Sequence, residues 1–184
     1  MGWLEEPETD PVDVAKAAAL RLAELTGTPG HDVALVLGSG WAPAADLLGE
    51  PLRVLTATDL PGFPAPRVEG HSALIRSVRI GDTDARALVF GSRTHLYEDR
   101  GVRAVAHAVR TAAAAGCKVV VLTNGCGSLV PGWHPGTPVL LSDHINLTGA
   151  SPLEGPSFVD LTDLYSPRLR AVAREVDPQL PEGV

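Results

Sequence analysis

Three short apolar runs, each followed directly by glycine or polar residues, constrain the fold of this chain more than any other feature. Residues 33–37 and 119–122 are apolar without interruption, which is the pattern of strands buried on both faces of a sheet. The third run, residues 87–90, closes a predicted strand over residues 85–90 that is joined to another strand, 73–79, around Gly81 and Asp82. A shorter strand is predicted at residues 139–142.

Three helices are predicted around these strands, and residues 41–48 can form another. The first has Asp10 as its N-cap and Pro11 in its first turn, and Gly27 ends it. The second covers residues 102–115, and the third begins after Ser166. The inner face of the second helix is predicted at Val102, Val105, Val109 and Ala113.

Composition and charge exclude several classes of protein. The 184 residues suit one domain of residues 1–184, and an apolar content of 45% suits a globular α/β protein. A net charge of −7 without a basic block argues against a nucleic-acid partner, and no segment is long and apolar enough to span a membrane. Cys117 and Cys126 follow no metal-ligand spacing, and we expect a reduced, cytoplasmic setting rather than a disulfide scaffold.

Residues 91–98, Gly-Ser-Arg-Thr-His-Leu-Tyr-Glu, follow the third apolar run. Side chains alternate between the two faces of an extended chain, so Arg93, His95 and Tyr97 are predicted to point the same way. A guanidinium, an imidazole and a phenol in one row suit an oxyanion with a hydroxylated group beside it. The alternative is a polar strand end whose groups are solvated or satisfied locally.

Glycine-rich turns follow the other two runs. Gly38-Ser39-Gly40 can bring backbone N–H groups to an anion, with the Ser39 hydroxyl as a further donor, and Thr123-Asn124-Gly125 is a second such turn. Ligands of open α/β sheets gather at strand ends, so the two turns and the Arg93 row are predicted to converge. A dinucleotide site is disfavoured because Pro43 stands where the third glycine of that fingerprint belongs. Tight strand-to-helix turns without a ligand are the alternative.

The motifs together resemble those of the trimeric purine nucleoside phosphorylases, most closely the actinobacterial members. They occur in family order over nearly the whole chain: Leu35-Val36-Leu37-Gly38-Ser39-Gly40-Trp41, Pro61-Gly62-Phe63-Pro64, Gly70-His71, Arg93-Thr94-His95-Leu96-Tyr97-Glu98, Thr123-Asn124-Gly125, Asp143-His144-Ile145-Asn146-Leu147 and residues 158–163. The resemblance implies a three-layer phosphorylase/hydrolase-like fold, with a central mixed, twisted sheet flanked by helices.

The resemblance also implies a reaction, in which inorganic phosphate attacks a purine (2′-deoxy)ribonucleoside to give the free purine and (2-deoxy)ribose 1-phosphate. Tyr97 would line the ribose, and Phe158 would cover the ribose of a neighbouring subunit, which makes a homotrimer expected. Phosphate is a co-substrate, and no metal or organic cofactor is implied. The implied phosphate-binding residues are Ser39, His71, Arg93, Thr94, His95 and Gly125.

Departures from the family pattern leave alternatives open. Ser92, Ala73 and Asp99 stand where the family usually has glycine, and Cys126 follows the Asn-Gly of the second turn. The family domain continues well beyond Val184, where its purine-binding Glu and Asn lie, so a fold incomplete at the C-terminus is expected. The alternatives are a non-catalytic remnant that binds phosphate or oligomerises, and a methylthioadenosine phosphorylase.

Overall fold

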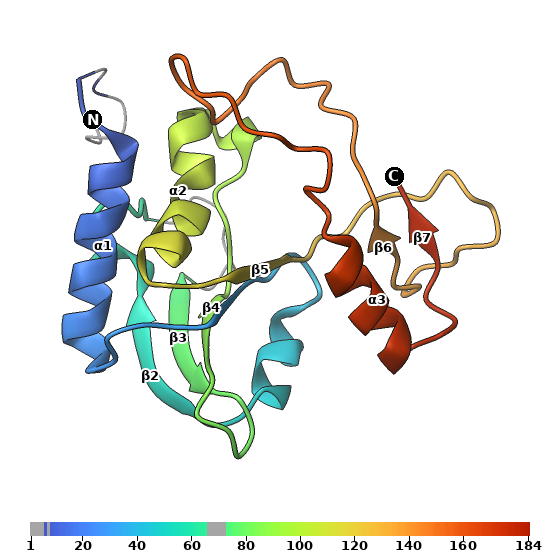
Figure 1. The fold of residues 1–184 in the computed structure, drawn as a ribbon, viewed down its shortest axis with the longest axis horizontal. Helices are drawn as coiled ribbons and strands as arrows, with labels where there is room; N and C mark the ends of the chain where they lie inside the picture. Colours follow the sequence, from blue (N-terminus) through green and yellow to red (C-terminus); the bar gives the residue numbers. More distant parts are fainter. Residues whose placement is uncertain (1–5, 7, 66–72) are drawn as a thin grey trace. The chain divides into compact units, whose positions relative to one another are not determined.

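The computed structural model describes residue 6, residues 8–65 and residues 73–184 of the chain (Figure 1). The chain divides into two compact units, residues 1–125 and residues 126–184. Each unit is described by itself below. The single domain predicted over residues 1–184 stays a prediction.

The first unit contains a five-stranded mixed sheet in the order β2-β3-β4-β1-β5. β1 (Val33–Val36) runs parallel to both of its neighbours, β4 (Arg86–Phe90) and β5 (Val119–Leu122). β3 (Leu74–Arg79) pairs antiparallel with β4 and with β2 (Pro51–Thr56). The carboxyl ends of β1, β4 and β5 therefore meet at one edge of the sheet, as the three apolar runs predicted.

Two strands at the ends of this order differ from expectation. β2 was not predicted, because nearly all of its residues are exposed and it lacks an apolar signature. β5 was predicted to be buried, but Val121 is 43% and Leu122 62% exposed. The prediction was wrong because β5 is an edge strand in this unit, and an edge strand has a neighbour on one side alone.

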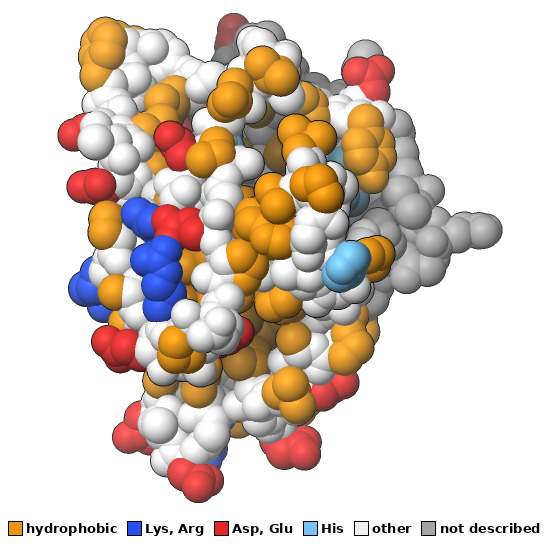
Figure 2. Space-filling model, turned by 90° about the vertical axis from the view of Figure 1, so that its right-hand side faces the viewer, with side chains coloured by type: hydrophobic (Ala, Val, Ile, Leu, Met, Phe, Trp, Pro, Cys, Tyr) orange, Lys and Arg blue, Asp and Glu red, His pale blue; other side chains and the backbone are white. Residues whose placement is uncertain are grey.

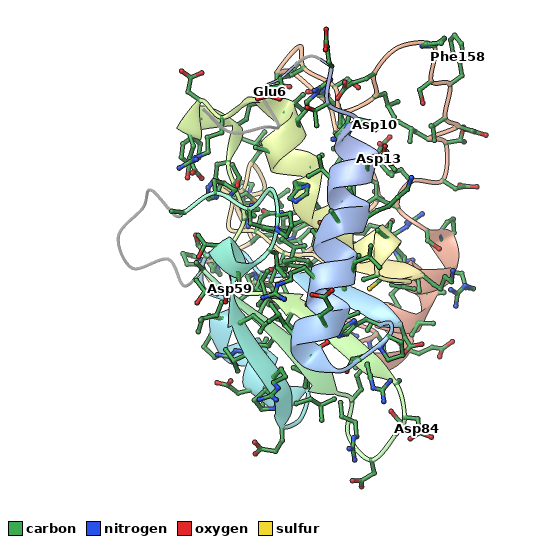
Figure 3. The ribbon with its side chains drawn as sticks, turned by 90° about the vertical axis from the view of Figure 1, so that its left-hand side faces the viewer. Glu6, Asp10, Asp13, Asp59, Asp84 and Phe158 are labelled. Carbon is green, nitrogen blue, oxygen red and sulfur yellow. The ribbon has the colours of Figure 1, made fainter. Side chains whose placement is uncertain are left out.

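Helix α1 (Pro11–Thr26) follows the predicted local signals closely. The Asp10 carboxylate accepts a hydrogen bond of 2.8 Å from the Val12 N–H, and Gly27 ends the helix with a φ of 65°. Asp10 and Asp13 lie together at the N-terminal end of the helix, where negative charge is favourable (Figure 3).

Helix α2 (Gly101–Ala114) forms where it was predicted but buries a different face. Its buried residues are Ala104, His107, Thr111 and Ala112. Val109 is 38% exposed, so the predicted inner face was wrong. Small residues let the helix pack closely, and His107 is tolerated inside because its Nε2 lies 2.9 Å from the Pro61 carbonyl oxygen.

Alternating residues of β4 supply two separate cores. Leu88 and Phe90 pack in one cluster with residues of α1 and α2, and Ala87 and Val89 pack in another with Ala45 of the 3₁₀ helix Ala42–Leu47. Because successive side chains of a strand point to opposite faces, the sheet is covered on both sides. The first unit therefore has three layers around β1 and β4.

The second unit contains helix α3 (Pro167–Val176) and two short parallel strands, β6 (Leu140–Leu141) and β7 (Glu182–Gly183). α3 begins at the predicted Ser166 cap, and Arg170 and Arg174 of this helix pair with Glu182. All residues from 126 to 184 are at least partly exposed. Hydrophobic side chains are accordingly visible on the molecular surface (Figure 2).

Candidate functional site

Gly38 is the point at which the predicted site residues converge. A Cβ atom on Gly38 would lie 2.4 Å from Nη1 of Arg93, 2.5 Å from the Thr123 carbonyl oxygen and 2.8 Å from Cα of Asn124. The Gly38 N–H donates to Oγ1 of Thr123 at 2.9 Å. No side chain fits at this position without displacing backbone, so glycine is required there. The turn after β1, the turn after β5 and Arg93 after β4 thus form one cluster, as predicted.

Backbone N–H groups of both turns are directed to no other described residue. The amides of Ser39, Gly40, Asn124 and Gly125 donate no hydrogen bond within the part of the chain that the structure describes, and all four residues are exposed. Gly125 lies against the first turn, because a Cβ atom placed on it would be 3.8 Å from the Ser39 carbonyl oxygen. Exposed N–H groups from two adjacent turns, without a partner among the described residues, form a site suited to an anion.

Arg93 adds a positive charge to this cluster. Its Nη1 donates to the Thr123 carbonyl oxygen at 3.1 Å, which holds the guanidinium beside the second turn. Its Nε and Nη2 make no hydrogen bond to another described residue. This pair of donors is the planar fork that binds two oxygens of a phosphate or carboxylate.

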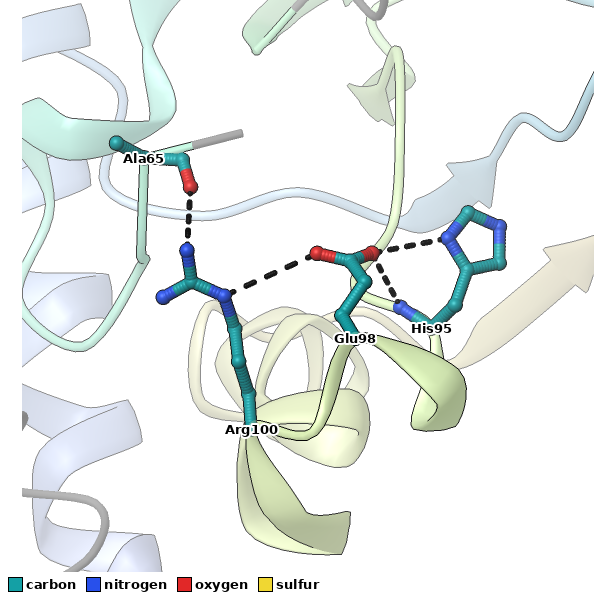
Figure 4. Close-up of polar contacts among 4 residues, drawn as sticks. All are labelled: Ala65, His95, Glu98 and Arg100. Carbon is teal, nitrogen blue, oxygen red and sulfur yellow. Dashed lines mark hydrogen bonds and ion pairs between the residues drawn. The ribbon is translucent and has the colours of Figure 1, made fainter. Parts of the chain in front are cut away.

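His95 is held by a polar chain that runs along the turn after Arg93 (Figure 4). Glu98 Oε1 accepts from the His95 N–H at 2.8 Å and lies 3.0 Å from the His95 ring atom Nδ1. Arg100 Nε lies 3.8 Å from Glu98 Oε2, and Arg100 Nη2 donates to the Ala65 carbonyl at 3.0 Å. The His95 ring is thus fixed through Nδ1, with Nε2 on its opposite side.

The Glu98 carboxyl group is ionised by these contacts although it is largely buried. Burial raises the pKa of this carboxyl group. The hydrogen bonds from the backbone and ring of His95, together with the charges of His95 and Arg100, lower the pKa by more than burial raises it, so the net shift is downward. An ionised Glu98 accepts from both His95 groups at once, which orients the imidazole.

Tyr97 departs from the extended row that the sequence predicted. Residues Leu96–Glu98 form a 3₁₀ helix with His95 as its N-cap, because Glu98 reaches back to the His95 N–H. The Tyr97 ring nevertheless stacks on the His95 ring, with centroids 4.7 Å apart and 15° between the planes. Tyr97 is 76% exposed, so its ring is accessible to a ligand.

A pocket lies beside the cluster. Arg93, Thr94 and Glu98 form part of its polar side, and Phe63 and Phe90 form part of its apolar side. Thr94, a predicted phosphate-binding residue, therefore lines a partly apolar pocket.

Two other predicted site residues lie outside the described part of the first unit. His71 lies outside the described residues. Phe158 belongs to the second unit, in which it is 95% exposed on a loop (Figure 3). In the same unit the Tyr165 hydroxyl lies 3.0 Å from His144 Nδ1, at the two ends of the segment that carries Phe158.

Cys117 is not placed for chemistry in the described structure. Burial, followed by the charge of Asp32, raises the pKa of the Cys117 thiol to about 11, which keeps it protonated and unreactive. No three His, Cys, Asp or Glu side chains among the described residues are grouped to hold a metal ion. The helices of the described parts are all too short or too polar to cross a bilayer.

Three residues lie in the predicted motifs and were given no individual role there, yet they build the site in the structure. Thr123 accepts hydrogen bonds from the Gly38 N–H and from Arg93. Glu98 orients the His95 ring. The Trp41 indole N–H donates to the Asn124 carbonyl oxygen. A signal was present for Glu98 alone, since His95-Leu96-Tyr97-Glu98 has the spacing of a capping box. Thr123 and Trp41 act between segments distant in sequence, which a local pattern does not reveal.

Comparisons with known proteins identify relatives of this chain. The model of the phosphorylase superfamily matches residues 32–184. The purine nucleoside phosphorylase of Cellulomonas sp. is 62% identical, over 98% of this chain and 65% of its own length. The purine nucleoside phosphorylase of Mycobacterium tuberculosis is 52% identical, over 98% of this chain and 67% of its own length. The chain thus spans about two thirds of these relatives.

Solved structures share the fold. A purine nucleoside phosphorylase in complex with ribose-1-phosphate has a TM-score of 0.81 and 25% identity, over 96% of this chain and 70% of its own. Isoform 2 of the Schistosoma mansoni enzyme, in complex with cytosine and ribose-1-phosphate, has a TM-score of 0.79 and 25% identity, over 94% of this chain and 65% of its own. The predicted phosphorylase-like α/β fold is confirmed. The chain therefore belongs to the phosphorylase superfamily, among its purine nucleoside phosphorylases.

Proposed function

We propose that the chain binds inorganic phosphate at the cluster around Gly38 and uses it to cleave purine (2′-deoxy)ribonucleosides. The proposal depends on one observation, the convergence at Gly38 of the Arg93 fork and two turns with exposed N–H groups. An acidic protein of net charge −7 needs such a local positive site to hold a dianion.

Each site residue has a role in this proposal. Arg93 binds two phosphate oxygens through Nε and Nη2, and the Gly125 N–H and the Ser39 hydroxyl bind further oxygens. His95, oriented by Glu98, faces the phosphate with Nε2, and Thr94 lies at its edge. His71 is assigned to the phosphate as well, on its motif alone.

The chemistry requires orientation more than it requires a nucleophilic side chain. A lone pair of a phosphate oxygen forms the bond to the anomeric carbon, while the electrons of the carbon–nitrogen bond leave with the purine. The purine takes up a proton from solvent, and hydrogen phosphate gives up its own proton to solvent as it becomes the sugar phosphate. The products are the free purine and (2-deoxy)ribose 1-phosphate. Fixed donors hold the attacking dianion in line without reorganising during the reaction. No metal or organic cofactor is needed beyond phosphate as the co-substrate.

The names of the relatives favour purine nucleosides over methylthioadenosine as the substrate. The actinobacterial proteins compared above are named purine nucleoside phosphorylases, and a structural neighbour is named in complex with ribose-1-phosphate, a product of the proposed reaction. We further propose one domain over residues 1–184, a homotrimer in which Phe158 covers the ribose of a neighbouring subunit beside Tyr97, and a place in cytoplasmic purine salvage.

The test is purine release from inosine and guanosine by the purified chain, with and without phosphate, alongside phosphate binding by calorimetry. Phosphate-dependent release supports the proposed reaction. Phosphate binding without release from the folded chain supports instead a non-catalytic phosphate-binding protein. Faster release from methylthioadenosine than from inosine would identify a methylthioadenosine phosphorylase, and absence of phosphate binding would contradict the proposed site.

A further inference from the structure

The turn after β5 contains a peptide group that needs an external contact to hold its orientation. Asn124 and Gly125 share one planar peptide, in which the Asn124 C=O and the Gly125 N–H point in opposite directions. Glycine accepts φ of either sign at little cost, so a peptide that precedes glycine can rotate with little steric resistance. The direction of the Gly125 N–H therefore depends on what binds the Asn124 carbonyl.

Trp41 supplies that contact. Its indole Nε1 donates to the Asn124 carbonyl oxygen at 3.2 Å. Its own backbone N–H donates to the Gly38 carbonyl oxygen at 3.1 Å, so Trp41 is anchored in the first turn while its ring reaches the second. The preceding carbonyl, of Thr123, is held by Arg93 at 3.1 Å. Two successive peptide groups of the second turn are thus fixed by side chains from other segments.

We propose that Trp41 is a positioning residue, whose indole N–H orients the Asn124–Gly125 peptide so that the Gly125 N–H faces the bound phosphate. This inference rests on the proposed function. Trp41 does not touch the phosphate; it acts through the peptide plane. The indole N–H is the relevant group, because Trp41 is 39% exposed and its ring is not part of either core cluster.

The test compares Trp41→Phe, which removes the N–H and keeps an aromatic ring, with Trp133→Phe, the same change in the second unit. Phosphate is titrated into each full-length chain while the Gly125 amide is followed by ¹H–¹⁵N NMR. We expect Trp41→Phe to weaken phosphate binding about 3- to 10-fold and to shrink the phosphate-induced shift of the Gly125 amide. Trp133→Phe should match the wild type in both.

Two controls separate the possible outcomes. Trp41→His keeps a ring N–H and should recover part of the affinity, whereas a general packing defect would not be recovered. Thermal unfolding of the variants shows whether the fold is intact. If the wild type binds phosphate and Trp41→Phe behaves like Trp133→Phe, the role of Trp41 is refuted. If the wild type itself shows no phosphate-induced shift, the proposed function fails, independently of Trp41. If the Gly125 amide signal of Trp41→Phe is the same as in the wild type without phosphate, Trp41 does not orient this peptide.

Discussion

The two units of the chain hold their structure in different ways. Every buried side chain among the described residues belongs to the first unit, where the sheet is covered on both faces. The second unit has no buried residue, and its order comes from local contacts such as the hydrogen bonds from Thr148 to Asn146 and from Thr162 to Asp160. The cluster around Gly38 therefore lies at the ends of packed strands, while the Phe158 loop is held by turns.

The largest difference is expected for leucine truncation. Leu88→Ala removes a fully buried side chain of β4 and should lower the free energy of unfolding by about 2–5 kcal/mol, because it leaves a cavity. Leu147→Ala, at a position 89% exposed in the second unit, should change it by less than about 0.5 kcal/mol. Urea unfolding of both variants measures the contrast, and equal losses would show that the two units do not differ in packing.

Replacing an arginine at the candidate site should weaken phosphate binding, whereas replacing one in the second unit should not. Arg93→Met removes the fork and should weaken phosphate binding by about 1.5–3 kcal/mol, or roughly ten- to a hundredfold. Arg93→Lys should recover part of the loss, since a lysine keeps the charge and loses the planar geometry. Calorimetry with phosphate gives the affinities, and Arg168→Met on the exposed side of α3 is the matched control. Equal affinity in Arg93→Met and Arg168→Met would remove Arg93 from the site.

Adding one methyl group at Gly38 or at Gly127 tests the same contrast between the two units. Gly38→Ala places a Cβ against backbone atoms of Thr123 and Asn124, so we expect a loss of about 1–3 kcal/mol in the free energy of unfolding, together with loss of phosphate binding. Gly127→Ala, where nothing lies within 4 Å, should be neutral. Chemical unfolding and phosphate titration report the two effects, and a stable Gly38→Ala variant that binds phosphate normally would show that the three segments do not converge.

Acid should destabilise the first unit through His31. Its Nε2 lies 2.8 Å from the buried Ser77 hydroxyl, and burial, then the charge of Arg86, lower its pKa from 6.5, with Asp32 acting in the opposite direction. The unfolded chain therefore binds the proton at higher pH than the folded chain, so stability falls as the pH drops below 6.5. The slope is at most about 1.4 kcal/mol per pH unit for one proton.

Unfolding between pH 7 and 5 measures this effect, over a range set roughly by the ordinary pKa of histidine. His31→Gln should flatten the slope, and the same change at the exposed His134 is the control. A slope that is identical in both variants would assign the acid sensitivity to other groups.

The smallest effect is expected at the Phe158 loop. Tyr165→Phe deletes the hydrogen bond to His144 and should cost about 0.5 kcal/mol, because the contact is partly exposed to water. Hydrogen exchange of residues 144–165 should increase while that of β4 stays constant. Increased exchange in β4 would mean that the units are not as independent as their burial indicates.

Local signals predicted the fold where local physics decides it. The Asp10 cap, the Gly27 end and the Ser166 cap act within a few residues, and each was found where expected. The exposure of β5 and the buried face of α2 were mispredicted, because both depend on which elements are neighbours rather than on the segment itself.

The candidate site shows the same division. Its convergence at the ends of β1, β4 and β5 was predictable, since parallel strands bring their carboxyl ends together. The 3₁₀ turn at Tyr97 was not predicted from the sequence, because the contact between Glu98 and His95 outweighs the tendency of the extended chain to continue. The contact of Trp41 with Asn124 was not predictable either, because it joins residues far apart in sequence.

The strand order has a consequence for how the site forms in time. β2, β3 and β4 are joined by short-range antiparallel pairing, whereas β1 must find β5 across most of the first unit, with Val33 beside Val119. Pairing between distant segments carries the larger loop-closure cost and slows folding. We expect the β3–β4 hairpin to form early and the β1–β5 pairing late. The Thr123 turn can meet Gly38 and Arg93 only after that pairing, so the ability to hold phosphate should emerge in the last folding step of the unit.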